Sequence, residues 1–345
     1  MINTIHIPPI NEEMAARMKK HVDQLTKPAG SLGQLEEIMI RMAAITGEMF
    51  PDLSHKAVAV FCGDHGVTEE GVSKYPKEVT GLMIQNFDRG KAAVNLLAKA
   101  AGAKLVVVDV GSEAEEIPKS VISARVRKGT RNFFKEKAMT KKEVMEAIQA
   151  GRDTVRRLKE QKVRLLAVGE LGIGNTTPGA AIAACLTGEE VQTMTGRGSG
   201  ISTQGYVRKC EVIQKALDFH RPDPDKPLEV LEKVGGLEIA GMVGAYAGAA
   251  EHRMPVIMDG FISTAAALTA VRWKPEIRPY LFASHLSEEP GHAILLAELN
   301  LKPLVHADMR LGEASGAALA MPMFETAVML AREMAVFKDL GLTAP

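Results

Sequence analysis

The chain of 345 residues is longer than one small hydrophobic core usually organises, so we expect one large domain and a smaller one. Its 42 basic and 42 acidic residues balance, which argues against a nucleic-acid partner. Three scattered cysteines, no visible signal peptide and no uninterrupted apolar helix exclude a disulfide framework and a membrane span, and they favour a cytoplasmic protein.

The N-terminal segment predicts two helices. The first covers residues 11–26, with Asn11 as its cap, and ends at Lys27-Pro28. The second begins at Ser31, which has the spacing of a capping box with Gln34, and ends at Gly47. A last helix, roughly 314–338, has no strand after it, and we expect it to pack with these two helices.

From residue 51 onward, short apolar runs alternate with stretches of helical periodicity. The runs are nearly apolar throughout, which is typical of strands buried on both faces of a parallel sheet. We expect strand ends at Cys62, Asp109, Val168, Asp259, Ser284 and Asp308. Helices are predicted at 77–100, 140–160, 176–186, 203–219, 236–251, 262–272 and 290–299.

This alternation predicts an open, doubly wound α/β fold with a mainly parallel, six-stranded, Rossmann-like sheet. We expect a large α/β catalytic domain over residues 51–324 and a small helical domain over 1–50 and 325–345. Ligands bind such sheets beyond the carboxyl ends of the strands, where this sequence places loops rich in glycine and polar residues.

The loop "GELGIGNTTPG" (169–179) is the best candidate for a phosphate site, although it is neither a P-loop nor a dinucleotide fingerprint. Gly172 and Gly174 allow backbone N–H groups to approach an anion, and Asn175, Thr176 and Thr177 begin a helix. A second loop, "TGRGSG", contributes Gly196, Gly198 and Gly200. Either loop could instead be only a tight structural turn.

Two glutamates, Glu170 and Glu313, follow glycine-flanked turns at strand ends. They are candidates for catalysis, although a single glutamate in a loop is usually only a solvated surface residue. A metal-dependent hydrolase stays open as an alternative, with ligands drawn from Asp64, His65, Asp259, His285, His292, His306 and Asp308. No spacing typical of a metal site occurs among them, so we expect neither a metal nor another cofactor.

Eight motifs, taken together and in order, resemble the nicotinate-nucleotide:dimethylbenzimidazole phosphoribosyltransferase family. They are "KPAGSLGQLE" (27–36), "GDHGV" (63–67), "EGVSKYPKEVTGLMIQNF" (70–87), "GELGIGNTT" (169–177), "TGRGSG" (195–200), "DGFISTAAAL" (259–268), "HLSEEPGH" (285–292) and "MRLGEASGA" (309–317). The resemblance runs from about residue 27 to the C-terminal helix.

The resemblance implies a transfer of the phosphoribosyl group of nicotinate mononucleotide to 5,6-dimethylbenzimidazole, with inversion at C1′, for the lower ligand of cobalamin. It implies Glu313 as general base, with Glu170 and Lys209 also in the active site. It further implies Asp259 and Ser287 on the ribose and phosphate, and a base pocket lined by Ser73, Tyr75, Met83 and Leu311. A homodimer is implied too.

Other classes of protein stay open. A noncatalytic nucleotide or benzimidazole-riboside binder would show a degraded site, whereas Glu313 and the loop glycines are intact. A nucleotide-binding oxidoreductase would need a complete dinucleotide fingerprint, which is missing. The preferred base, whether a benzimidazole, a purine or a phenolic compound, also stays open.

Overall fold

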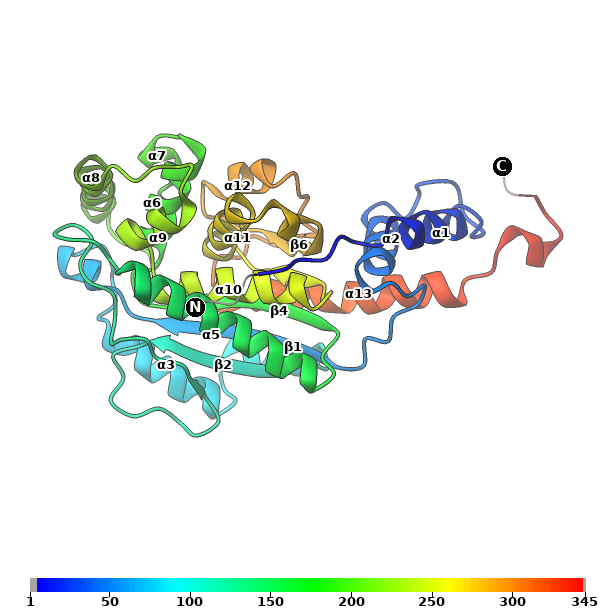
Figure 1. The fold of residues 1–345 in the computed structure, drawn as a ribbon, viewed down its shortest axis with the longest axis horizontal. Coiled ribbons are helices and arrows are strands. Elements are labelled where there is room, and N and C mark those ends of the chain that lie inside the picture. The colour runs from blue at the N-terminus through cyan, green and yellow to red at the C-terminus, as the bar shows by residue number, and fades with distance from the viewer. Residues whose placement is uncertain (1–4, 344–345) are drawn as a thin grey trace.

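The computed structural model describes residues 5–343 and is built around a parallel sheet of six strands, in the order β3-β2-β1-β4-β5-β6 (Figure 1). The strands are β1 (Lys56–Gly63), β2 (Lys104–Gly111), β3 (Ile122–Ser123), β4 (Leu165–Leu171), β5 (Val256–Met258) and β6 (Leu281–Ala283). Every residue of β1 and β4 is buried, as strands covered on both faces require.

Thirteen α-helices surround the sheet within the described residues. They are α1 (Glu12–Val22), α2 (Gln34–Thr46), α3 (Glu78–Asp88), α4 (Ala93–Ala100), α5 (Lys141–Glu160), α6 (Thr176–Thr187), α7 (Val191–Met194), α8 (Thr203–His220), α9 (Pro227–Val234), α10 (Leu237–Glu251), α11 (Phe261–Trp273), α12 (His292–Glu298) and α13 (Ser315–Glu333). Three short 3₁₀ helices, η1 (Gly66–Glu70), η2 (Pro275–Tyr280) and η3 (Phe337–Leu340), complete this part of the chain.

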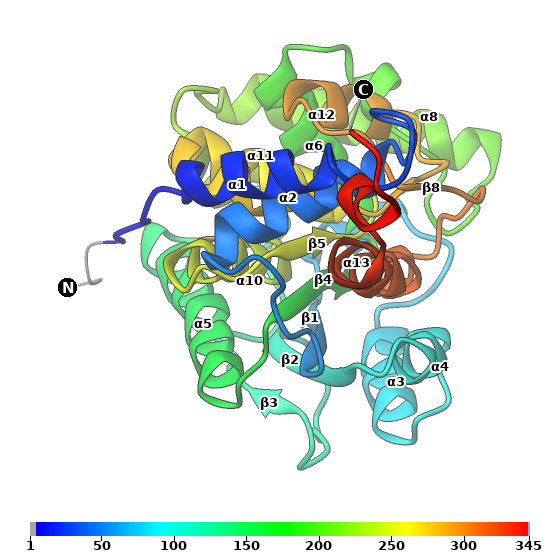
Figure 2. The same cartoon turned by 90° about the vertical axis from the view of Figure 1, so that its right-hand side faces the viewer.

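The helices form two layers against the sheet. Helices α5 and α10 lie on one face of the sheet, while α3, α4 and α13 lie on the other (Figure 2). Helices α6, α8, α9 and α12 form a further group over α11. Among the described residues, no helix has the length and apolar character to cross a membrane.

The predicted α/β class and the six-stranded parallel sheet are confirmed, but one strand was assigned wrongly. The run that ends at Asp308 forms β8 (Val305–His306), which pairs with β7 (His285–Leu286) in a separate two-stranded sheet. The sixth strand of the main sheet is β3, at its edge beside β2. Only two residues long, β3 has no apolar run to reveal it.

Two helix predictions also need correction. The predicted helix 77–100 is interrupted between α3 and α4, where Gly90 has a φ of 70°. The second helix begins at Gln34 after Gly33, and its first turn is closed by the Glu36 side chain, which accepts from the Leu32 N–H. The capping box expected at Ser31 is therefore wrong. A capping box does form at the start of α5, between Thr140 and Glu143.

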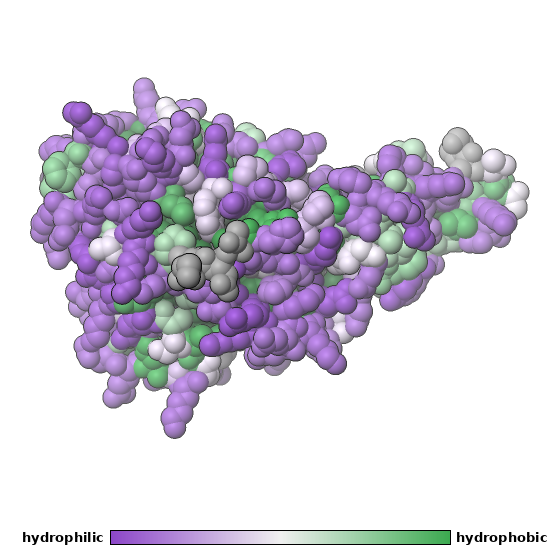
Figure 3. Space-filling view, viewed as in Figure 1, coloured by the Kyte–Doolittle hydropathy of each residue, from purple (hydrophilic) through white to green (hydrophobic). Residues whose placement is uncertain are grey.

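Helices from the N-terminal and C-terminal parts of the chain form a narrow group beside the sheet (Figure 1). Helix α2 packs against α1 and α13, and Leu25 forms an isolated antiparallel bridge with Val336. Figure 3 shows apolar surface among hydrophilic side chains at this narrow end. Helix α13 runs without a break through residue 325, and the division into two domains at that point stays a prediction.

Candidate active site

A cavity of about 500 Å³ opens beyond the carboxyl ends of β4, β5 and β6. Its walls come from six segments that are far apart in the sequence: 72–83, 170–176, 198–199, 260–262, 285–289 and 310–313. This is the edge at which an open parallel sheet binds its ligands. The fold therefore gathers most of the polar loops noted in the sequence around one space.

Glu170 reaches this cavity from the end of β4. Its side chain is buried, and the Asn175 side-chain amide donates a hydrogen bond to its Oε2 atom. Burial raises the pKa of Glu170 well above its usual range, and the nearby Glu238 carboxylate raises it further. Glu170 is therefore biased toward its protonated form.

Glu313 lies beside Glu170 because two backbones come into direct contact. The Glu313 N–H donates to the Glu170 carbonyl oxygen over 3.1 Å, and a side chain at Gly169 would overlap the backbone of Ala314. Glu313 and Ala314 both have a φ of 60°, a left-handed conformation that costs a non-glycine residue about 1 kcal/mol or more.

The carboxyl group of Glu313 has an unusual acidity. The side chain is buried, and this burial, followed by the charge of Asp259, raises its pKa to about 7. A carboxylate with this pKa can accept a proton at neutral pH and is a better base than an ordinary glutamate. Glu170 and Glu313 thus differ in the protonation state that their surroundings favour.

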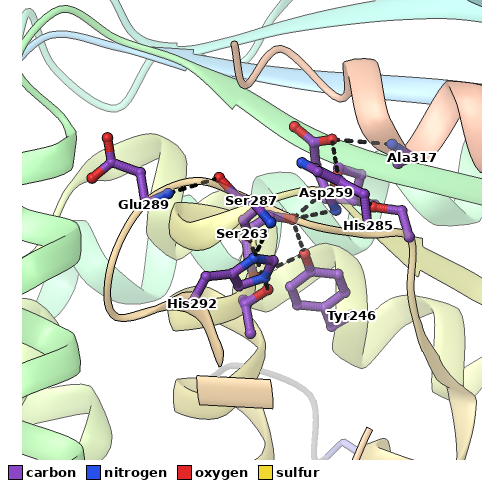
Figure 4. A network of polar contacts seen from close by, with 12 residues as sticks. Tyr246, Asp259, Ser263, His285, Ser287, Glu289, His292 and Ala317 are labelled. Carbon is purple, nitrogen blue, oxygen red and sulfur yellow. Dashed lines mark hydrogen bonds and ion pairs between the residues drawn. The ribbon is translucent and has the colours of Figure 1, made fainter. Parts of the chain in front are cut away.

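Asp259, whose charge acts on Glu313, forms a polar network with His285 (Figure 4). Asp259 follows β5, and its Oδ1 atom accepts from the Ala317 N–H over 3.0 Å and lies 4.0 Å from His285 Nδ1. His285 lines the cavity, whereas Asp259 is almost fully buried and does not. Burial raises the pKa of Asp259, and the neighbouring His285 opposes that shift.

The loop 172–177 forms the tight turn expected between β4 and α6. Gly174 has a φ of 86°, and the N–H groups of Asn175 and Thr177 donate to Gly172 and Gly174 inside the turn. The N–H groups of Gly174 and Thr176 have no acceptor among residues 5–343. These two donors, at the start of a twelve-residue helix, suit an anion.

Lys209, on α8, connects this turn with the loop 195–200. Its buried Nζ atom lies 2.7 Å from Thr176 Oγ1 and 3.2 Å from the Gly196 carbonyl oxygen. A Cβ atom on Gly198 would lie 2.6 Å from Thr176 Oγ1, so only glycine allows the two loops to approach. Burial lowers the pKa of Lys209 to about 8.

Part of the cavity wall is more apolar. Met83 from α3, Tyr75 from the preceding loop and Leu311 from the segment before α13 line it, together with Ser73. Tyr75 and Leu311 are about half exposed, with 48% and 54% of their surface accessible. Such a wall suits a flat apolar ring that enters from solvent.

The phosphoribosyltransferase family model matches residues 7–342 of this chain. The nicotinate-nucleotide–dimethylbenzimidazole phosphoribosyltransferase of Geobacter sp. (strain M21) is 49% identical over 98% of this chain and 97% of its own. The protein of the same name from Ruminiclostridium cellulolyticum is 46% identical over 96% and 94%. The crystal structure of CobT from Thermus thermophilus superimposes with a TM-score of 0.92 at 43% identity, covering 96% of this chain and all of that one.

The chain belongs to the nicotinate-nucleotide–dimethylbenzimidazole phosphoribosyltransferase family. The family resemblance noted in the sequence is thereby confirmed, and so is the expectation of a transferase. The roles of single residues stay predictions, because a match over the whole chain does not test them.

The structure brings most of the predicted site residues to the cavity. Its lining includes Glu170, Gly172, Gly174, Asn175, Thr176, Gly198, Ser287, Glu313, Ser73, Tyr75, Met83 and Leu311. Lys209, Gly196 and Gly200 lie behind or beside the 198–199 wall, and the buried residues Thr177 and Asp259 lie beneath the surface. Any contact of Asp259 with a ligand would need a change in this arrangement.

The alternative metal ligands do not converge. Among residues 5–343, no group of three or more histidine, cysteine, aspartate or glutamate side chains is placed to hold a metal ion. His306 and Asp308 are exposed, away from the buried Asp64 and His65. His285 does reach the cavity, but as part of the Asp259 network.

Sequence reasoning missed several residues of the cavity. Glu289 lies in the quoted motif "HLSEEPGH", and Arg310 lies in "MRLGEASGA", yet neither was singled out. Phe261 and Ile262 lie in the quoted motif "DGFISTAAAL" but were not named as site residues either. Their position directly after a strand end, beside motif residues, is the signal that could have identified them.

The raised pKa of Glu313 predicts a pH-dependent stability. In the unfolded chain the group titrates near 4.5, so its cost to the folded state begins as pH rises through 4.5 and is complete above about 7. We expect Glu313→Gln to be more stable than wild type at pH 8.5, by up to roughly 3 kcal/mol, and to differ little at pH 4. Urea unfolding at both pH values measures this.

The exposed Glu333, at the end of α13, provides the control. Glu333→Gln should change stability little at either pH. An equal stability difference for Glu313→Gln at pH 4 and pH 8.5 would contradict the assigned pKa.

Proposed function

We propose that this protein transfers the phosphoribosyl group of nicotinate mononucleotide to 5,6-dimethylbenzimidazole, giving α-ribazole 5′-phosphate and nicotinate. Relatives of that name match nearly the whole chain. The observation that carries the proposal is the pair Glu170 and Glu313, two buried carboxyl groups of different acidity on the wall of one cavity. The reaction belongs to the synthesis of the lower ligand of cobalamin.

The 5′-phosphate is proposed to bind where α6 begins. The N–H groups of Gly174 and Thr176, the Ser287 hydroxyl and the adjacent 198–199 wall supply donors there. Lys209 supplies a positive charge behind Thr176. A mononucleotide has no second phosphate, so neither a Walker lysine nor a dinucleotide fingerprint is needed.

In the proposed reaction the bond between C1′ and the nicotinate nitrogen breaks, and its electron pair neutralises the pyridinium ring. A ring nitrogen of the benzimidazole attacks C1′ with its lone pair from the opposite face, which inverts the configuration. The benzimidazole then loses the proton on its other nitrogen, and the product is neutral in the base. One proton acceptor is therefore required.

Glu313 is proposed as that acceptor, since its pKa of about 7 matches the role of a general base at neutral pH. Glu170, biased toward its protonated form, is proposed to orient the incoming ring by hydrogen bonding. Two carboxyl groups whose surroundings separate their acidities are a common arrangement for acid–base catalysis. Intact carboxyl groups also disfavour the alternative of a noncatalytic binding protein.

Replacing the base should affect the chemical step. We expect Glu313→Gln to lower kcat by about 10²–10⁴-fold, because the amide keeps the shape but accepts no proton. Wild-type kcat should rise with pH through about 7, as the carboxylate forms, and this limb should vanish in the variant. Chromatography of nicotinate release at saturating substrates measures both.

Glu170→Gln is the matched comparison, because both side chains line the cavity. An amide at 170 can still donate a hydrogen bond, so its loss of kcat should be smaller. A larger loss in Glu170→Gln than in Glu313→Gln would move the base to β4.

The phosphate site predicts a different kinetic signature. Lys209→Met keeps an apolar stem in the buried position but removes the ammonium beside Thr176. We expect the KM for nicotinate mononucleotide to rise by about 10–100-fold, since a charge-assisted contact is worth roughly 1.5–3 kcal/mol. The control, Lys215→Met, lies exposed on the same helix and should leave KM unchanged. An unchanged KM in Lys209→Met would place the phosphate elsewhere.

We also propose that the protein is a cytoplasmic homodimer. Free thiols at Cys62, Cys185 and Cys210 suit a reducing compartment. Exposed apolar side chains on α13 and after it, at Leu319, Met329, Leu340 and Leu342, support association of two copies.

Light scattering at micromolar concentration should give twice the chain mass of 37.1 kDa. Met329→Lys, on the exposed face of α13, should shift the population toward monomer, while Arg332→Lys, near it on the same helix, should not. A wild-type mass near that of one chain would refute the dimer.

A further inference from the structure

A buried ion pair lies beneath the cavity without touching it. His65, which follows β1, places its Nε2 atom 2.9 Å from the Oε1 atom of Glu238, in the first turn of α10. Both side chains are fully buried, and neither lines the cavity. Although burial lowers it, the Glu238 carboxylate raises the pKa of His65 overall, which favours the charged pair.

Glycine backbones enclose the pair on three sides. A Cβ atom would lie 2.9 Å from Glu238 Oε2 if added to Gly63, and 2.6 Å from His65 Cε1 if added to Gly236. A Cβ atom on Gly172 would lie 3.2 Å from His65 Nε2. Glycine at these three positions therefore leaves the space that the two side chains occupy.

Gly172 is the contact that leads to the active site. The same added Cβ atom would lie 3.4 Å from the Asn175 amide nitrogen, which donates to Glu170. The imidazole of His65 thus packs against the turn whose far side holds the Glu170 carboxyl group. The Glu238 charge also acts on Glu170 directly, as the largest influence on its pKa after burial.

Stability alone explains such a pair poorly. Two charges taken out of water lose several kcal/mol of hydration each, and an apolar pair of similar volume is often at least as stabilising. The surrounding core of α10 is almost entirely apolar, with Leu237 and Ile239 on either side of Glu238. A charged pair in this position suits a positioning role, in which a directed hydrogen bond and a fixed charge hold neighbouring groups in place.

We propose that His65 and Glu238 are positioning residues that hold the Gly172–Asn175 turn, and through the Asn175 amide the Glu170 carboxyl group, beside Glu313. The inference rests on the proposed function, because it assigns the pair to the transfer step. The inference predicts that replacing either residue lowers kcat, because Glu170 is displaced, and leaves substrate binding nearly unchanged.

The test compares kcat with KM in three variants. His65→Ala removes the ring, and we expect kcat to fall by about 10–100-fold while KM for both substrates changes less than about threefold, as for a displaced catalytic group. His65→Gln keeps an N–H donor toward Glu238 and should recover most of kcat. Glu238→Gln keeps the shape without the charge and supplies the measurement if His65→Ala does not fold.

The decisive experiment adds Glu238→Gln to Glu170→Gln. Because the pair is proposed to act through Glu170, the double variant should lose little more than Glu170→Gln alone. Independent, multiplicative losses would overturn the inference, as would a full kcat in both His65→Ala and Glu238→Gln.

Glu251→Gln is the matched control. Glu251 ends the same helix in an ion pair with Arg152 at 2.8 Å, away from the cavity, and its replacement should leave kcat unchanged. If neither wild type nor Glu251→Gln released nicotinate, the proposed function itself would fail. With both active, the His65 and Glu238 variants judge the inference alone.

Discussion

The burial of carboxyl groups at the carboxyl ends of parallel strands is the constraint on which the site depends. Glu170, Asp259 and Glu313 come from three separate segments and are all buried, and burial raises the pKa of each. An unpaired carboxylate in a buried site is costly, so burial favours the protonated form of each of these carboxyl groups. In the proposed reaction, positive charge develops at C1′ of the ribose, and the carboxylates then gain a partner that the free protein lacks.

The backbone makes this crowding possible. Gly169 lets Ala314 come against β4, and Glu313 and Ala314 adopt a left-handed conformation beside the Glu170 backbone, with the Glu313 side chain on the cavity wall. Strain of this kind persists only where the surrounding structure fixes it, here through the start of α13 and the Asp259 contact with Ala317. The short sequences around these two glutamates therefore encode a close approach between chain segments, in addition to two acids.

The sequence predicts the long strands and the loops of the site well, but it does not predict the short edge strand or the residues behind the cavity. Long buried strands such as β1 and β4 are visible as apolar runs, and the loops after them indicate the site because parallel strands end at one edge. The two-residue strand β3 carries no such signal, because its pairing with β2 is decided by tertiary contacts. Residues behind the cavity were hardest to predict, since Glu238, the partner of His65, lies 173 residues further along in an apolar helix without a motif of its own. Only the fold shows that the two meet beneath Gly172.

Groups of both signs of charge surround the cavity. The start of α6 and the Lys209 ammonium behind it supply positive charge, while Glu170 and Glu313 line the same cavity with carboxyl groups. In the proposed complex the 5′-phosphate lies at the start of α6 and the reacting C1′ lies near the carboxyl groups. The reverse orientation would place the anionic phosphate among the carboxyl groups, where like charges repel. Transfer neutralises the pyridinium nitrogen, so the attraction of that nitrogen to the neighbouring carboxylates weakens at the step in which nicotinate must depart.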